Sequence, residues 1–112
     1  VKIEFNFNNG VFSGFVSYGH TFYDVKGKDV VCSAVSTLLQ TFEFGLKEIL
    51  KLKTDCKKKS GSFYCFITEK KRESLEIKIK ILSDTIIGSL KIIEKQYPEH
   101  LKISIKEKSD GT

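Results

Sequence analysis

The chain has 112 residues, a formal net charge of +5, 40% hydrophobic residues and 29% charged residues. This length suits one domain with one core, and this composition excludes a wholly disordered chain and a fibrous protein. No apolar run approaches the roughly 20 residues of a transmembrane helix, and the N-terminus lacks the apolar stretch of a signal peptide, so we expect a soluble cytoplasmic protein.

The first part of the chain alternates between apolar and polar residues. Residues 1–7 read VKIEFNF, a period of two that predicts a strand. Asn8-Asn9-Gly10 is typical of a turn, and a second strand is predicted over residues 11–18, so the chain opens with an antiparallel hairpin. A glycine-bounded loop is predicted over residues 19–28.

An amphipathic helix is predicted over about residues 30–50. Apolar residues recur there every three or four positions, which is the spacing of a buried helical stripe. Asp29 precedes them as a suitable N-cap. The residues of the stripe are Val31, Val35, Leu38, Phe42, Leu46 and Ile49.

Residues 52–56 and 62–68 predict a second hairpin. The hairpin lies in the most basic part of the chain, because residues 51–80 contain ten Lys or Arg and four Asp or Glu. The run Lys57-Lys58-Lys59 is interpreted as part of a solvated turn, and contact with a polyanion such as RNA is the alternative.

The chain has three cysteines, Cys32, Cys56 and Cys65. An odd number in a domain that is large enough to fold without cross-links argues against a secreted disulfide framework. We therefore expect reduced thiols. Cys56 and Cys65 flank the basic turn and face one another if the hairpin forms, and we expect them to pack there as thiols.

The last third of the chain predicts a helix and a strand. Residues 75–81 alternate like a strand, but a helical spacing of apolar residues runs unbroken from 75 to 97, so we favour a helix that ends before Pro98. Gly88 within this helix suggests close packing against a neighbour. Residues 101–106 alternate again and predict a final strand.

The predicted order of elements is therefore β-β-α-β-β-α-β. Each helix has one apolar stripe and each strand has one apolar face, and these are best buried when both helices cover one side of a mainly antiparallel sheet. We predict a two-layer α+β fold, with one domain over residues 1–108 and a frayed polar tail at 109–112.

Residues 19–36 give the strongest indication of chemistry. If Asp29 caps the helix, Cys32 is the third helical residue, where unpaired backbone N–H groups and the helix dipole favour a thiolate. A thiolate that takes part in acyl transfer needs a partner to accept and return a proton, and imidazole suits this near neutral pH. His20 is the better candidate because His100 is predicted to lie in a surface turn. On these residue types alone, a buried structural cysteine remains the simpler interpretation.

The segment as a whole resembles a known signature. Gly-His at 19–20, followed by G-x-D-x-V-C-x-A-x-S at 27–36, resembles the signature of the ribosomal-processing cysteine protease family. The resemblance covers nearly the full chain, including both hairpins and the helix that ends IIEKQYP at 92–98. The chain departs from the family pattern at Thr21 and Ser33, and neither change removes a reacting group.

The resemblance implies a homodimeric protease that trims a short N-terminal extension from a large-subunit ribosomal protein, cutting beside an aromatic residue. It implies that Cys32 is the nucleophile and that His20 is the general base and then the acid. It implies no cofactor, and the absence of C-x-x-C spacing indicates no metal site. The residues with implied secondary roles are Asp29 and Ser36 as support, Gly19 and Gly27 as loop hinges, and Phe22 and Tyr23 as substrate contacts.

Other interpretations stay open at this point. Asp29 could serve only as a helix cap, Ser36 could be an ordinary helix residue, and the loop aromatics could fill a core or a dimer contact. Backbone N–H groups at the start of the helix, including that of Cys32, are the expected donors to an oxyanion. The rival function is a non-catalytic ribosome- or RNA-associated binding module, with weak contact to ribosomal RNA through residues 51–80. A thiol redox protein is disfavoured by the absence of a C-x-x-C pair.

Overall fold

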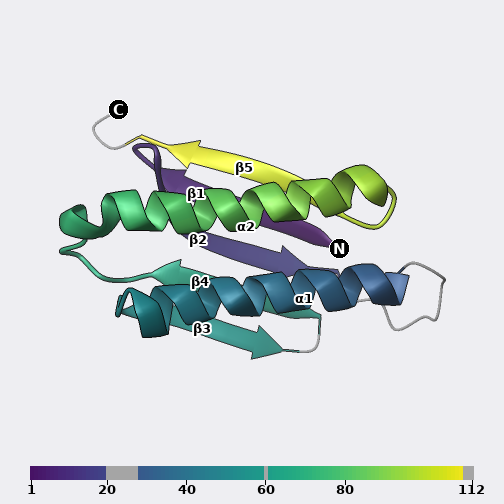
Figure 1. The fold of residues 1–112 in the computed structure, drawn as a ribbon, viewed down its shortest axis with the longest axis horizontal. Coiled ribbons are helices and arrows are strands. Elements are labelled where there is room, and N and C mark those ends of the chain that lie inside the picture. Colours follow the sequence, from purple (N-terminus) through teal and green to yellow (C-terminus); the bar gives the residue numbers. More distant parts are fainter. Residues whose placement is uncertain (20–27, 60, 110–112) are drawn as a thin grey trace.

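The fold was analysed in a computed structural model. It describes residues 1–19, 28–59 and 61–109, with the backbone alone for residues 28 and 29. These residues form five strands and two long helices in the predicted order (Figure 1). The strand order in the sheet is β3-β4-β2-β1-β5, and all neighbours are antiparallel except β1 and β5, which are parallel. The predicted two-layer α+β fold is confirmed.

The element boundaries follow the periodic segments of the sequence closely. The strands are β1 (Lys2–Asn8), β2 (Val11–Tyr18), β3 (Thr54–Lys59), β4 (Ser62–Ile67) and β5 (Lys102–Lys108). The helices are α1 (Lys28–Phe44), which continues into a π-helical turn (Gly45–Ile49), and α2 (Glu76–Gln96), which follows a 3-10 turn (Glu73–Leu75). The helix favoured for the ambiguous stretch at 75–81 is therefore confirmed.

Turn residues explain how the first hairpin closes. Asn9 and Gly10 both have positive φ, 52° and 80°. Two consecutive residues with positive φ form the kind of turn whose twist matches that of paired strands, and asparagine and glycine adopt this conformation most readily. The predicted turn is therefore confirmed.

Three local predictions were wrong. β3 extends to Lys59, so the three consecutive lysines belong to a strand and not to the turn. α1 begins at Lys28, one residue before the predicted cap. Gly88 is exposed and has nothing within 4 Å of an added Cβ, whereas at Gly45 an added Cβ would lie 2.7 Å from Leu82 Cδ2. Among the described glycines, Gly45, in the π-helical turn after α1, is thus the one that lies closely against α2.

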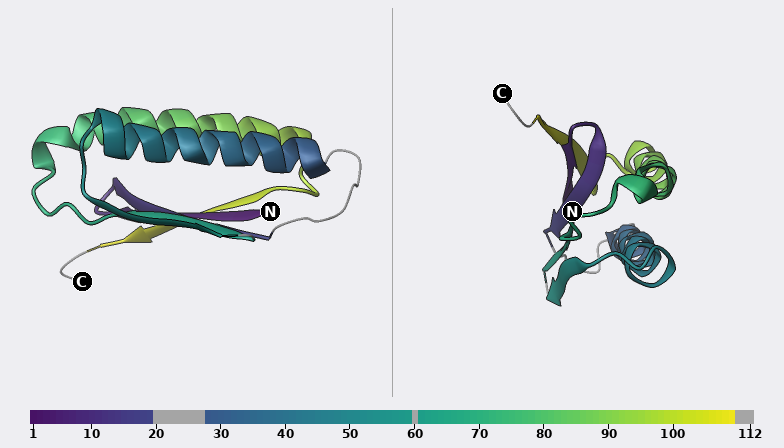
Figure 2. Two further views of the ribbon diagram at one scale, coloured as in Figure 1. Left: turned by 90° about the horizontal axis from the view of Figure 1, so that it is seen from below. Right: turned by 90° about the vertical axis from the view of Figure 1, so that its left-hand side faces the viewer.

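Both helices lie on one face of the sheet (Figure 2). The buried apolar side chains of the two layers form one core cluster. Phe42 of α1 packs on Phe12 and Phe15 of β2, with ring centroids 4.6 Å and 5.7 Å apart. On α2 the fully buried residues include Ile79 and Leu90. Burial of each such side chain contributes about 1.5–3 kcal/mol, so the two stripes hold the layers together.

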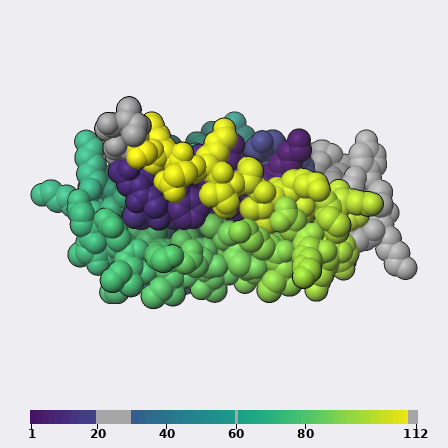
Figure 3. Space-filling model, turned by 90° about the horizontal axis from the view of Figure 1, so that it is seen from above, coloured from purple at the N-terminus to yellow at the C-terminus, as the bar shows by residue number. Residues whose placement is uncertain are grey.

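The edge of the molecule formed by β5 lies beside α2, with β1 behind it (Figure 3). Neither helix crosses to the opposite face of the sheet (Figure 2). Among the helices of the described residues, none is both long enough and apolar enough to span a membrane.

Candidate active site

A hollow of about 570 Å³ lies between α1, the end of β2 and the tip of the β3–β4 hairpin. Most of its lining is apolar, and its polar side chains come from α1, the end of β2 and the β3–β4 hairpin. The residues that line it are Val1, Ser17, Tyr18, Gly19, Cys32, Val35, Ser36, Leu39, Lys58, Lys59, Gly61, Ser62 and Phe63. This is a concave, mainly apolar surface with a few converging polar groups, as in many small-molecule and peptide sites.

The buried stripe of α1 sets the position of Cys32. Val31 and Val35 point into the core at 1% and 3% exposure. Cys32 follows Val31, so its side chain lies on the flank of the stripe, partly buried, and borders the hollow. Ser36 lies four residues later on the same side of the helix and borders the same hollow.

Ser36 connects the helix to the hairpin. Its hydroxyl oxygen accepts hydrogen bonds from Gln40 Nε2 at 2.9 Å and from Lys58 Nζ at 3.4 Å. Lys58 therefore brings a positive charge to the rim of the hollow. Sequence reasoning missed this role because it placed the lysines in a turn; in the strand, Lys58 shares a face with Cys56, which points toward the helices.

Gly19 borders the hollow at the end of β2. It has a φ of +96°, a conformation that favours glycine, and an added Cβ would lie 3.4 Å from Val1 Cα. Its backbone N–H donates to the carbonyl oxygen of Gly61 at 3.3 Å, which fastens the end of β2 to the hairpin tip. Gly19, the first residue of the predicted loop, is therefore part of the wall of the hollow.

A comparison with known protein families shows which family the chain belongs to. The family model described as "Cysteine protease Prp" matches residues 1–102. The chain belongs to the cysteine protease Prp family. It is a cysteine protease, and the predicted family resemblance is confirmed.

Solved structures share the fold at low sequence identity. SMU.848 from Streptococcus mutans matches with a TM-score of 0.82 and 20% identity, covering 96% of this chain and 94% of that one. The ribosomal processing protease Prp from S. aureus, solved with a substrate peptide, matches with a TM-score of 0.80 and 18% identity, covering 94% of this chain and 98% of that one. The same protease with a covalently linked product peptide matches with a TM-score of 0.76, 19% identity and the same coverage. No curated protein sequence matches this chain.

Several predicted site residues of this Prp-family chain lie outside the described residues. They are His20, Phe22, Tyr23 and Gly27, together with the side chain of Asp29. Of the predicted residues, the structure brings together Gly19, Cys32 and Ser36 around one hollow. His100 lies in the turn after α2, as predicted; it is partly buried, and it is outside the described lining of the hollow.

The start of α1 changes the expected environment of Cys32. Because α1 begins at Lys28, Asp29 lies within its first turn and is not its N-cap, contrary to the prediction. Cys32 is the fifth helical residue, so its backbone N–H donates within the helix to the carbonyl oxygen of Lys28. The N–H groups without a helical acceptor belong to the preceding residues, including Val30. Which N–H groups at the start of α1 bind an oxyanion stays a prediction.

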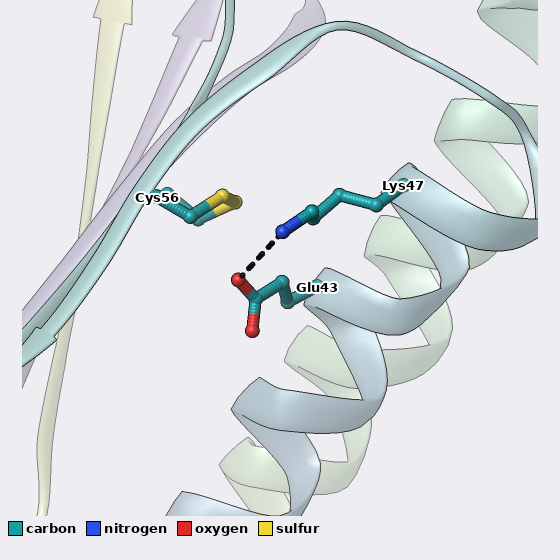
Figure 4. Close-up of a disulfide and its surroundings, with 4 residues drawn as sticks. Glu43, Lys47 and Cys56 are labelled. Atoms are coloured by element: carbon teal, nitrogen blue, oxygen red, sulfur yellow. Dashed lines mark ion pairs between the residues drawn. A yellow bond between two sulfur atoms is a disulfide. The ribbon is translucent and has the colours of Figure 1, made fainter.

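Cys56 and Cys65 form a disulfide, contrary to the expectation of reduced thiols. They lie directly opposite one another in the antiparallel pair β3–β4, and this register brings the two sulfur atoms together. Figure 4 shows the disulfide beside the ion pair of Glu43 and Lys47, whose Oε2 and Nζ are 3.6 Å apart. Among the described residues, Glu43 and these two cysteines are the one group of three residues with side chains that could hold a metal ion. Sulfur bonded in a disulfide is not a thiolate ligand, so this group does not indicate a metal site.

Proposed function

We propose that this protease removes a short N-terminal extension from a large-subunit ribosomal protein, with Cys32 as nucleophile and His20 as general base. The observation that carries the proposal is the position of Cys32 beside a hollow whose wall ends at Gly19, the residue before His20. Membership in a protease family favours this over the non-catalytic binding module. The S. aureus relative is named a ribosomal processing protease and was solved with a substrate peptide, which supports the substrate class.

The proposed reaction is an acyl transfer through a thioester. His20 accepts the proton of the Cys32 thiol, and the thiolate attacks the carbonyl carbon of the scissile peptide bond. The carbon–nitrogen bond then breaks, His20 returns the proton to the leaving amine, and the acyl group remains on sulfur. Water, deprotonated by His20, attacks the thioester and releases a carboxylic acid and the Cys32 thiol. The covalently linked product peptide on the S. aureus relative is consistent with such an intermediate.

The remaining predicted residues have supporting roles in this proposal. The N–H groups of the first residues of α1 bind the oxyanion, because they have no acceptor within the helix. Ser36 holds a polar contact to Lys58 at the rim of the hollow. Asp29 supports the geometry of the catalytic pair, Phe22 and Tyr23 contact the substrate, and Gly19 and Gly27 act as hinges.

The partners follow from the same proposal. The peptide substrate lies across the hollow, with an apolar side chain beside Val35, Leu39 and Phe63. The protein is a homodimer, as the resemblance implies, and it acts in the cytoplasm, as expected from the sequence. Weak contact with ribosomal RNA through residues 51–80 completes the proposed set of partners.

The test uses the purified chain and an N-terminally extended large-subunit ribosomal protein from the same genome, followed by intact mass measurement. One defined cleavage is expected from the wild type and none from Cys32→Ala or His20→Ala. His100→Gln is the matched control for the histidine and should cleave like the wild type. Cleavage by Cys32→Ala at the wild-type rate, or equal losses from both histidine variants, would contradict the proposed pair.

A further inference from the structure

The face of the sheet that the helices leave uncovered collects side chains from all five strands. Side chains alternate along a strand, and Phe5, Phe15 and Cys65 point to the helix side, so their neighbours point the other way. The strand register aligns these neighbours in rows across the sheet. The rows, which we name the open face, are Lys59, Ser62, Tyr18, Lys2 and Lys102; Lys57, Tyr64, Val16, Glu4 and Ser104; and Asp55, Phe66, Gly14, Asn6 and Lys106.

The open face is strongly basic. Its rows contain five lysines and two carboxylates, a net charge of +3 out of +5 for the whole chain. Lys106 pairs with Glu4 at 3.2 Å, and the other four lysines are exposed. Only Lys57 and Lys59 come from the basic segment 51–80, since the rest come from the two ends of the chain. The fold therefore assembles a positive surface that the charge pattern along the sequence does not reveal, and a polyanion is its electrostatic complement.

Two aromatic rings lie among these lysines. Tyr64 and Phe66 are on the open side of β4, with ring centroids 6.1 Å apart. The Phe66 ring lies against Gly14, where an added Cβ would collide with it. Both residues are partly buried, so each ring rests on the sheet and leaves part of its surface to solvent. Rings held on a sheet in this way stack unpaired bases, while neighbouring lysines contact phosphates.

A second hollow, of about 410 Å³, lies beside Phe66 on this face. Its polar lining includes Asn6, Asn8 and Lys106. Asn8 Oδ1 is buried, and among the described residues it has no hydrogen-bond partner. An amide group carries donors and acceptors that match the edge of a base, so the hollow offers both a stacking ring and a polar group to one nucleotide.

We propose that the open face binds single-stranded RNA, with bases stacked on Tyr64 and Phe66 and phosphates held by lysines on both edges of the sheet. RNA as the polyanion rests on the proposed function, which places the enzyme in ribosome maturation. A single strand is favoured over a duplex because bases in a duplex are already stacked and cannot reach the two rings. Lys59 and Tyr18 border both the open face and the Cys32 hollow, so the bound strand ends beside the active site.

The test is fluorescence anisotropy with a 5′-fluorescein-labelled oligouridine 12-mer at 50 and 200 mM salt. Wild-type affinity should fall as salt rises. Tyr64→Leu with Phe66→Leu should weaken binding at least about fivefold, because the ring faces are lost while apolar volume remains. Lys57→Ala with Lys102→Ala should weaken binding and also reduce the salt slope. Lys91→Ala with Lys95→Ala removes two exposed charges from α2 outside the segment 51–80 and should change the affinity less than twofold.

The outcomes separate this inference from the proposed function, because each variant is also assayed for peptide cleavage, which reports its folding. RNA binding without cleavage would contradict the proposed function alone, and cleavage without RNA binding would overturn the inference alone. The inference also fails if both lysine pairs lower the affinity equally, or if a duplex of the same length binds as tightly as the single strand. A wild-type dimer that dissociates in the Tyr64→Leu/Phe66→Leu variant would show that a second copy covers the open face, which would overturn RNA as its occupant.

Discussion

α1 and α2 lie side by side on one face of the sheet, and each buries one apolar stripe (Figure 1). They differ in what borders the stripe. On α1, Cys32 and Ser36 flank it and face a hollow closed by the hairpin tip. On α2, the fully buried Ser83 donates its hydroxyl to the carbonyl oxygen of Lys80 at 3.1 Å, within the same helix. The comparison shows that an amphipathic pattern predicts which side of a helix is buried against the sheet. Whether the residues beside the buried stripe line a hollow or join the core depends on the strands that lie next to them.

The largest expected difference between the helices is in catalysis. Cys32→Ala should lower kcat/KM for peptide cleavage on the order of 10³-fold or more, since the nucleophile is lost. Cys32 is partly buried and lies on the flank of the stripe, so the free energy of unfolding should change by no more than about 1 kcal/mol. Cleavage kinetics and urea unfolding of the same preparation check both values. Retained cleavage by Cys32→Ala would show that Cys32 is not the nucleophile.

Leu90→Ala should produce the opposite result on α2. Leu90 is fully buried, so its truncation should lower the free energy of unfolding by about 2–5 kcal/mol. The folded variant should keep kcat/KM within about twofold, because α2 does not line the Cys32 hollow in the described part of the chain. Urea unfolding and kinetics at a temperature where the variant is folded provide the measurement. A tenfold loss of activity there would show that the site depends on α2.

The next smaller expected effect is the loss of stability when the disulfide of the β3–β4 hairpin, which faces α1, is reduced. Cys56 and Cys65 are nine residues apart, and closing so short a loop should stabilise the folded state by about 2.5–3 kcal/mol. Dithiothreitol should therefore lower the urea midpoint of the wild type. The Cys56→Ala variant is the control, since reductant should not change its midpoint. An equal decrease of the urea midpoint in both proteins would show that the reductant does not act through this disulfide.

The comparison of the helices also shows where sequence reasoning succeeded and where it stopped. Both helices and the hairpins could be predicted from the spacing of apolar residues along the sequence. The turn at Asn9 and Gly10 could be predicted from its residue types. The family motif predicted Cys32 and Ser36 as site residues, and both border one hollow in the structure. Lys58 was missed because β3 ends three residues later than predicted, and in this longer strand Lys58 faces α1. The sequence alone does not define how β3 pairs with β4. The open face was missed for the same reason, since its lysines come from strands that are distant in sequence.

The smallest expected effect concerns Lys58, the contact between the hairpin and α1. Lys58→Ala should lower kcat/KM by about two- to fivefold, because Lys58 is exposed and its hydrogen bond to Ser36 is long at 3.4 Å. Lys58→Arg should restore most of the loss, and Lys91→Ala on α2 should have no effect. If Lys58 acts through Ser36, adding Ser36→Ala to Lys58→Ala should cost little more than either change alone. Additive losses would instead show that Lys58 contacts the substrate directly, which would make the hairpin part of the binding surface and not only its support.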